Sequence, residues 1–286
     1  MAQQHLLPIA NQRTVTPRLH WLTVHAPALA RSIRAGQYLL VRGGLPGSHD
    51  PLLRRPLFVA AAEEALGQIG LLYAPSDDHG LAWLARGHEG DVVDTIGPFG
   101  HGFTLDRRTR NLLLVGQGAG LTALLLLAQQ ATAQNCAVTL VVGAGDEAML
   151  PPPFLLPGEV EYQSVVGDVT SLLVATAPDK ETGSHGATEP RGQSLSSPTL
   201  PVSSSALLTW ADQICAALPG EQVPVLRDAI RTVKYRWERG FASVLIEGPL
   251  VCGVGACGVC VVETRCGPRM LCSDGPVFDL RDVGRE

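Results

Sequence analysis

The sequence predicts a mixed fold in three parts: an N-terminal antiparallel β-barrel, a central α/β domain built on a parallel sheet, and a small C-terminal loop subdomain. Short β-type segments separated by Gly, Pro and polar turns fill the first third of the chain. A continuous apolar segment then runs into a glycine-rich turn and a helix-forming run. Five of the seven cysteines fall between residues 252 and 272. Clustered thiols in a chain of this length indicate metal or redox chemistry.

The composition supports a folded protein and excludes several functional classes. Of 286 residues, 45% are hydrophobic and 17% are charged, which is enough to build a core. Lys and Arg number 22 against 27 Asp and Glu, a net charge of −5, so nucleic-acid binding is not the expected task. No apolar run approaches the ~18 residues of a membrane span, and residues 1–13 lack the layout of a secretory signal. We therefore expect a cytoplasmic protein without a membrane span.

The barrel is predicted over residues 1–105. Strands are expected at 20–25, 37–42, 57–61 and 69–73, with one helix at 80–86. The turn at 97–100 is expected to close this part.

The α/β domain is predicted over residues 106–247. An apolar strand at 112–115 precedes the glycine-rich turn, a helix at 121–133 and a second strand at 138–143. A later helix is expected at 225–239 and a strand at 243–247. Residues 177–205 are mostly Ser, Thr, Gly and Pro, which predicts a flexible insertion, with a functional lid as the alternative.

The glycine-rich turn consists of Gly116, Gly118 and Gly120. Its spacing differs from the G-x-G-x-x-G fingerprint, because the third glycine comes one residue early. The turn nevertheless follows a buried strand and opens a helix, where free N–H groups can face a pyrophosphate. A tight turn without any ligand is the alternative.

The third part, residues 248–286, contains the cysteine loop. Cys252, Cys257 and Cys260 have the C-x4-C-x2-C spacing of plant-type [2Fe–2S] proteins, and small residues between them let backbone N–H groups approach sulfur. Structural zinc is the alternative. Cys272 is the expected fourth ligand, because Cys266 is expected at a hairpin tip.

Two cysteines lie outside this cluster. Cys136 and Cys215 are expected to be buried small apolar residues.

Two segments of the barrel are candidates for holding a phosphate or a flavin. Arg54 and Arg55 precede Pro56, and an Arg beside a rigid Pro can hold such a group at a fixed distance, although an ordinary surface pair is the alternative. Tyr73 ends a strand, and Gly80 opens a short helix; taken alone, Tyr73 is equally compatible with the core.

In order along the chain, these features resemble the electron-transfer subunit of type-B (NAD-dependent) dihydroorotate dehydrogenase, within the ferredoxin–NADP reductase superfamily. The resemblance covers nearly the whole chain. It rests on segments 35–38, 53–57, 96–103, 116–120, 252–260 and 272–278.

The resemblance implies a FAD-binding barrel, an NAD-binding α/β domain and a [2Fe–2S] loop. It places flavin contacts on Arg55, Pro56, Leu57, Phe58, Leu72, Tyr73, Ala74, Gly80 and Leu81, a nucleotide turn on Gly116, Gly118 and Gly120, and cluster ligands on Cys252, Cys257, Cys260 and Cys272.

Three departures from the family pattern stand out. Phe58 replaces the usual Ser and removes a hydroxyl from the flavin face. Ala74 and Leu81 replace residues that are often Arg and Thr, so pyrophosphate binding is expected to use backbone N–H groups. Cys215 begins a Cys-Ala-Ala segment where the superfamily usually has Cys-Gly near the nicotinamide.

The function implied is an oxidoreductase subunit in pyrimidine biosynthesis. Electrons pass from the FMN of a catalytic subunit, in a heterotetramer, through [2Fe–2S] and FAD to NAD⁺. The cofactors supply the chemistry, so no catalytic acid or base is expected in this chain. The alternatives are a related reductase subunit serving ferredoxin, hydrogenase or a sulfur acceptor, and a non-enzymatic zinc-stabilised sensor or scaffold.

Overall fold

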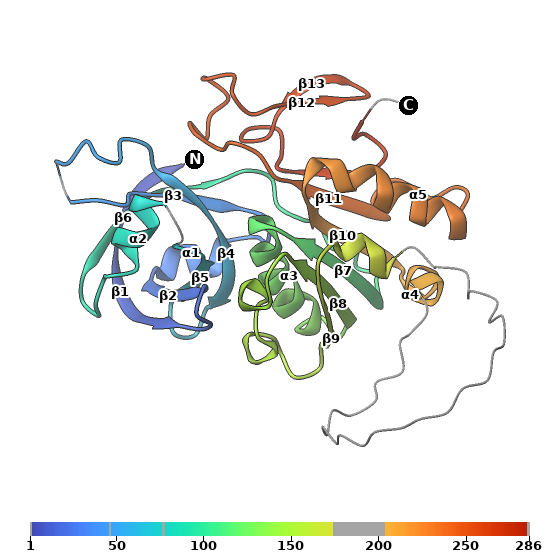
Figure 1. Ribbon diagram of the computed structural model, residues 1–286, viewed down its shortest axis with the longest axis horizontal. Helices are drawn as coiled ribbons and strands as arrows, with labels where there is room; N and C mark the ends of the chain where they lie inside the picture. Colours follow the sequence, from blue (N-terminus) through green and yellow to red (C-terminus); the bar gives the residue numbers. More distant parts are fainter. Residues whose placement is uncertain (1, 46, 76–77, 174–203, 285–286) are drawn as a thin grey trace, which may run out of the picture.

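The computed structural model describes residues 2–45, 47–75, 78–173 and 204–284, and shows a barrel beside a sheet domain with the cysteine loop against both (Figure 1). Most of the predicted insertion, residues 177–203, lies outside the described residues. None of the helices within the described ranges has the length and apolar character that crossing a bilayer requires.

The predicted antiparallel barrel is confirmed. Six strands close in the order β1-β2-β5-β4-β3-β6. They are β1 (Gln3–Thr14), β2 (His20–His25), β3 (Tyr38–Val41), β4 (Arg55–Glu63), β5 (Gln68–Tyr73) and β6 (Val92–Phe99). Besides α2 (His79–Leu84), the barrel carries α1 (Pro27–Ser32), so the expectation of a single helix there is wrong. The helix α1 has only six residues, too few for a helical period to show in the sequence.

The ends of the barrel also differ from the sequence prediction. Strand β1 lies entirely before the first strand expected, and residues 97–99 belong to β6 rather than to a turn. The strand β1 pairs with both β2 and β6, which closes the barrel.

The predicted parallel sheet is confirmed as well. Its order is β14-β11-β10-β7-β8-β9, and the chain reverses direction across the sheet between β7 and β10. The parallel strands are β7 (Asn111–Gln117), β8 (Ala137–Ala144), β9 (Glu161–Val166), β10 (Gln213–Leu218) and β11 (Ala242–Ile246). The helices are α3 (Thr122–Thr132), α4 (Ser204–Trp210) and α5 (Val223–Val233), so the helix expected to reach residue 239 ends six residues earlier.

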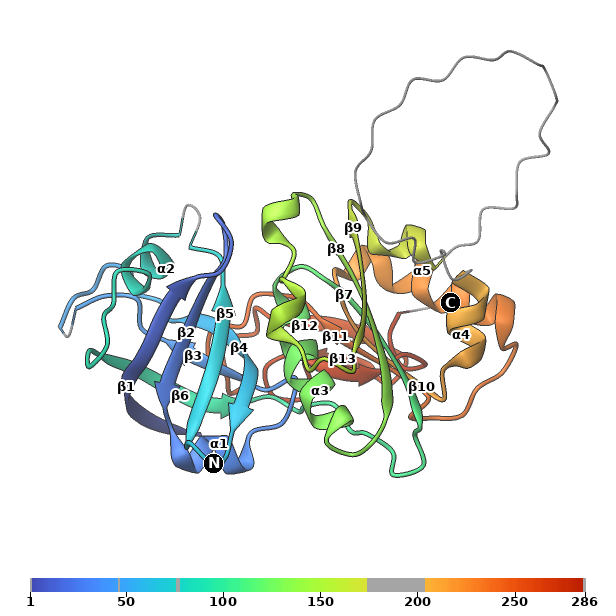
Figure 2. The same cartoon turned by 90° about the horizontal axis from the view of Figure 1, so that it is seen from below.

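Helix α3 joins the two large parts. It lies between the barrel and the sheet in Figure 2, and its residues 122–128 are buried. The Gln129 side chain donates to Ala62 O at 2.9 Å and accepts from Ala62 N at 3.2 Å, which ties α3 to strand β4. The barrel and the sheet therefore meet over a packed and hydrogen-bonded helix.

The cysteine subdomain contains the hairpin of β12 (Val261–Thr264) and β13 (Gly267–Met270). After Cys272 the chain enters β14 (Val277–Asp279), which pairs antiparallel with β11. It also contacts the barrel, because His101 donates its backbone N–H to Gly275 O at 2.5 Å. The subdomain thus shares a strand with the sheet, and the domain limits drawn from the sequence stay a prediction.

Candidate functional site: a cavity and a cysteine loop

A cavity of about 550 Å³ opens where the barrel meets the sheet. Eight residues predicted to bind a flavin or a nucleotide line it: Pro56, Leu57, Phe58, Leu72, Tyr73, Ala74, Leu81 and Gly118. Four others, Arg55, Gly80, Gly116 and Gly120, are not in its lining. The sequence analysis missed the rest of the wall: Arg18, Leu19, Gln117, Ala119, Leu121, Thr122, Ala144, Gly145, Asp146, Met149, Pro151 and Pro219.

The barrel wall of this cavity is mostly apolar because β4 and β5 direct hydrophobic side chains to it. Phe58, which replaces the Ser of the family pattern, is buried, and its ring centroid lies 5.7 Å from that of Tyr38. The hydroxyl of Tyr73 accepts a long hydrogen bond from Gln12 Nε2 at 3.4 Å. Burial raises the pKa of Tyr73, so its hydroxyl stays protonated at neutral pH.

The start of α2 lies beside Arg55. Arg55 Nε donates to Asp78 Oδ2 at 2.5 Å, and the other oxygen of Asp78 accepts the backbone N–H of Leu81 at 2.9 Å. Burial opposes ionisation of Asp78, but the Leu81 N–H and the Arg55 guanidinium outweigh it, so the pKa of Asp78 is lowered. Arg55, Gly80 and Leu81 are therefore neighbours, as expected for a shared contact, but two of their donors pair with this carboxylate.

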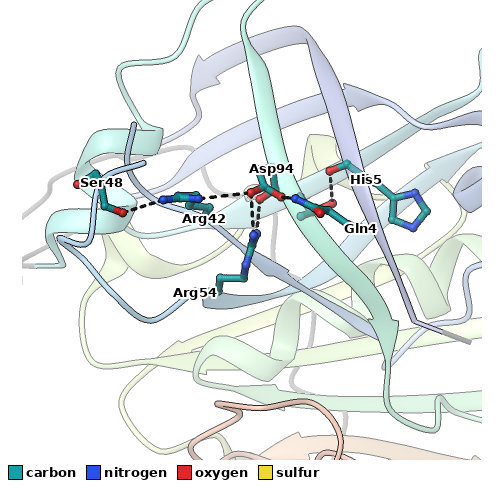
Figure 3. Close-up of polar contacts among 7 residues, drawn as sticks. Gln4, His5, Arg42, Ser48, Arg54 and Asp94 are labelled. Atoms are coloured by element: carbon teal, nitrogen blue, oxygen red, sulfur yellow. Dashed lines mark hydrogen bonds and ion pairs between the residues drawn. The ribbon is translucent and has the colours of Figure 1, made fainter. Parts of the chain in front are cut away.

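The two consecutive arginines point to different carboxylates. Arg54 donates to Asp94 Oδ2 at 2.7 Å, and Gln4 donates to the other Asp94 oxygen at 2.9 Å. Arg42 lies 3.8 Å from Asp94 and donates to Ser48 O at 2.7 Å; Figure 3 shows these side chains converging. Burial is again outweighed by Arg54 and Gln4, and the pKa of Asp94 is lowered. Arg54 thus pairs with Asp94 within the barrel, whereas Arg55 pairs with Asp78 at the start of α2.

The glycine-rich turn connects β7 to α3 at the reversal of strand order, where open α/β sheets bind ligands. Its most informative neighbour is Glu247, which follows β11. Glu247 Oε1 accepts the N–H of Gly120 at 2.5 Å, and a Cβ at Gly118, whose φ is 82°, would lie 2.5 Å from the same oxygen. Burial raises the pKa of Glu247, with Glu221 adding to the effect. Nothing in the local sequence marks Glu247.

Cys215 is not part of the cavity. It lies inside β10, fully buried, and burial raises the pKa of its thiol to about 12. It is a core residue, as expected, and so is Cys136. In the segment that contains Cys215, the residue that lines the cavity is Pro219, which follows the end of β10.

The cysteine loop brings together the four predicted ligands. Cys252 and Cys257 interact, as do Cys260 and Cys272. The N–H groups of Val254 and Cys257 lower the pKa of Cys252 to about 6, whereas burial raises the pKa of Cys272 to about 12. No three His, Cys, Asp or Glu side chains in the described part of the chain are arranged to hold a single metal ion.

The structure separates Cys266 from this group. Cys266 is exposed at the tip of the β12–β13 turn, whereas Cys272 is buried and its Sγ accepts the N–H of Gly255 at 3.1 Å. Gly253 has a φ of 74°, and a Cβ there would lie 2.6 Å from the Phe99 ring. The loop backbone therefore contacts the barrel at Phe99 and donates a hydrogen bond to the sulfur of Cys272.

The donor set fits a two-iron cluster. Two cysteine pairs can supply two thiolates to each iron, with backbone N–H groups directed at sulfur. The cavity has the volume and the mostly apolar wall of a small-molecule site, which suits the ring system of a flavin.

Fold and site together define a class of protein: a flavin reductase built on a barrel and a nucleotide-binding sheet, with an iron–sulfur loop attached. The iron–sulfur cluster binding domain of dihydroorotate dehydrogenase B matches residues 247–284. A dihydroorotate dehydrogenase B (NAD(+)) electron transfer subunit of Shouchella clausii (strain KSM-K16) is 30% identical over 287 residues, covering 98% of both chains. That of Geobacillus kaustophilus (strain HTA426) is 29% identical over 288 residues, covering 99% of both.

The chain belongs to the family of dihydroorotate dehydrogenase B electron transfer subunits, which confirms the resemblance. Among solved structures, an NADH-dependent reduced ferredoxin–NADP oxidoreductase matches with a TM-score of 0.65 and 20% identity, over 98% of this chain and 90% of the other. The ferredoxin reductase in carbazole 1,9a-dioxygenase, in its FAD apo form, matches with a TM-score of 0.52 and 16% identity, over 81% and 63%. Such likeness shows the fold alone.

Proposed function

We propose that this chain is an oxidoreductase subunit that carries electrons from the FMN of a dihydroorotate dehydrogenase catalytic subunit, by way of a [2Fe–2S] cluster and FAD, to NAD⁺. One observation carries the proposal: β4 and β5 line the cavity with the predicted flavin residues, the four-cysteine loop packs on Phe99 of β6, and only β3 separates β4 from β6 in the barrel. The family relatives over the full length favour this function over the other reductase subunits. The iron–sulfur domain match argues against the zinc scaffold.

Cys252, Cys257, Cys260 and Cys272 hold the cluster in this proposal. The N–H of Gly255 already donates to Cys272, and the N–H groups of Val254 and Cys257 stabilise the Cys252 thiolate. The bonds to Cys252 favour its thiolate form, which is the form that binds iron.

The barrel side of the cavity holds the flavin. Pro56, Leu57 and Phe58 from β4, with Leu72 and Tyr73 from β5, exclude water from the ring, and Ala74 and Leu81 complete the wall. Arg55 is the nearby cation for the diphosphate, once it turns from Asp78. When bound, FAD exchanges single electrons with a cluster and a hydride with a nicotinamide.

The sheet side of the same cavity takes NAD(H). Gly118 and Gln117 line it at the reversal of strand order, together with Asp146, which follows the neighbouring strand β8. Gly116 keeps the turn close to α3, because a Cβ there would lie 3.0 Å from the Leu124 side chain, and Gly120 keeps it close to β11, because a Cβ there would lie 2.7 Å from the Leu245 side chain.

The catalytic partner docks over the cysteine loop. Val254, Val259 and Val261 are exposed there, and Cys257 is exposed beside them. Exposed apolar residues next to a redox centre suit a partner that must approach closely. A heterotetramer of the two subunits follows from the family resemblance. The cytoplasmic location stays a prediction.

The test combines the purified chain with a dihydroorotate dehydrogenase catalytic subunit that contains FMN. We expect the purified chain alone to show flavin absorbance that NADH bleaches and to contain two irons. Reduction of NAD⁺ by dihydroorotate should occur only when both subunits are present. Zinc without flavin would overturn the proposal. So would a chain that reduces ferredoxin with NADH but gives no NAD⁺ reduction with the catalytic subunit.

A further inference from the structure

Tyr38 occupies the boundary between the barrel and the cysteine loop. It is the first residue of β3, fully buried, and it pairs in register with Phe58 of β4 and Phe99 of β6. The ring centroids of Phe58 and Phe99 each lie 5.7 Å from that of Tyr38. Phe58 lines the cavity, and Phe99 packs on Gly253 of the cysteine loop. The three rings therefore bridge the two candidate cofactor sites.

The hydroxyl of Tyr38 has no hydrogen-bond partner among the described residues. A buried hydroxyl without a partner costs on the order of 1–3 kcal/mol, and a phenylalanine would fill the same apolar position without that cost. The hydroxyl therefore requires a ligand that the protein part of the structure does not supply.

The surroundings of Tyr38 indicate where that ligand lies. A Cβ at Gly100 would lie 3.3 Å from the Tyr38 ring and 2.6 Å from Pro276, so the ring lies beside the segment that follows Cys272. Besides burial, the negative charges of the Cys272, Cys260 and Cys252 thiolates raise the pKa of Tyr38. The ring thus lies against the cysteine loop at two places, through Phe99 on Gly253 and beside Pro276, and the hydroxyl keeps its proton.

We propose that the Tyr38 hydroxyl donates a hydrogen bond to a sulfur of the [2Fe–2S] cluster, either a cysteine Sγ or an inorganic sulfide, and thereby raises the cluster's reduction potential. The inference rests on the proposed function, since it needs the cluster. A hydrogen bond to sulfur is stronger when the cluster gains negative charge, so it stabilises the reduced form more than the oxidised form. Tyr38 is a positioning and tuning residue, and no proton leaves it.

The experiment is a potentiometric titration of the cluster, followed by electron paramagnetic resonance, in the wild-type chain and in Tyr38→Phe. Iron and sulfide are first measured in the wild-type chain; their absence would refute the proposed function, whereas the potential tests only the role of Tyr38. We expect Tyr38→Phe to keep two irons and to show a lower midpoint potential. An unchanged potential would overturn the proposal.

The matched control is Tyr162→Phe. Its partly buried hydroxyl donates to Pro151 O at 2.7 Å, away from the cysteine loop, so its loss should leave the cluster potential unchanged. A similar shift in both variants would also count against a specific role for Tyr38.

If Tyr38→Phe loses iron, the proposal is tested in the wild-type chain instead. Infrared difference spectra of a chain labelled with ring-deuterated tyrosine should show a tyrosine C–O band that shifts when the cluster is reduced and that persists in Tyr73→Phe. Absence of such a band would overturn the proposal.

Discussion

The turn at 116–120 and the loop at 252–260 are both rich in glycine, and both display backbone N–H groups at a candidate cofactor site. They differ in what those groups meet. In the turn, the N–H of Gly120 donates to the carboxylate of Glu247. In the loop, the N–H of Gly255 donates to the sulfur of Cys272, and those of Val254 and Cys257 stabilise the Cys252 thiolate.

The difference shows that glycine spacing identifies where a backbone can be approached, but not which group approaches it. Outside the cysteine loop, the chain supplies its own anions: Glu247 at the glycine-rich turn of the sheet and Asp78 at the start of α2 in the barrel. An anionic cofactor must compete with them. On the cysteine side, the acceptors are the ligands themselves, so the same N–H groups support the cofactor directly.

The largest expected effect is the loss of the cluster from the cysteine loop. Cys272→Ala removes a buried thiol to which Gly255 donates, and we expect loss of both irons and of the visible absorbance of the cluster. Iron analysis and the anaerobic spectrum measure this.

Cys266→Ala is the matched control, because this thiol is exposed at the hairpin tip. It should retain two irons per chain. If Cys266→Ala lost iron and Cys272→Ala kept it, the assignment of the fourth ligand would be wrong.

A second prediction concerns Asp78, the anion that pairs with Arg55 at the start of α2. Asp78→Asn keeps an acceptor for the N–H of Leu81 but removes the charge that holds Arg55. We expect FAD to bind about tenfold more tightly, which corresponds to about 1.4 kcal/mol, the scale of a charge-assisted hydrogen bond. Fluorescence titration of the flavin-free chain with FAD measures the Kd.

Asp94→Asn serves as the control for that measurement. Asp94 pairs with Arg54 and Arg42 away from the cavity lining, so its loss should lower stability without changing the Kd for FAD. Weaker FAD binding in Asp78→Asn would show that Asp78 organises Arg55 for the diphosphate rather than competing with it.

Much of this arrangement can be predicted from the sequence because it is local. The apolar run at 112–115 and the glycines after it specify a buried strand and a tight turn, and the spacing of Cys252, Cys257 and Cys260 specifies a loop that can surround a cluster. Residues 56–58 and 72–74 were predicted from a resemblance and line one cavity.

The remainder depends on contacts between distant segments. Glu247 contacts the glycine-rich turn because the sheet order places β11 near β7, with β10 between them. The sequence periodicity does not reveal this strand order. From its sequence context, Tyr38 is an ordinary strand aromatic, and only the fold places it beside the cysteine loop through Phe99 and Pro276. Helix α1 was missed because it is short, and strand β1 because its polar residues and Pro8 interrupt the regular apolar alternation that predicts a strand.

The smallest expected effect sharpens the comparison at the turn itself. Glu247→Gln preserves an acceptor for the Gly120 N–H and removes a charge that burial disfavours. Because the folded pKa of Glu247 is raised above its ordinary value of 4.5, the folded chain binds this proton more tightly than the unfolded chain. The wild-type chain therefore loses stability as the pH rises through that raised pKa, and the Gln variant does not.

We expect Glu247→Gln and the wild-type chain to have similar Tm values near pH 4, where the carboxyl is protonated in the fold. At neutral pH the variant should be more stable by about 1 kcal/mol, or roughly 2–4 °C in Tm for a chain of this size. Thermal unfolding followed by circular dichroism across this pH range measures the difference. A variant that is less stable at neutral pH would mean that the charged carboxylate, held by the Gly120 N–H, stabilises the turn. The glycine-rich turn would then resemble the cysteine loop, where backbone N–H groups stabilise an ionised side chain.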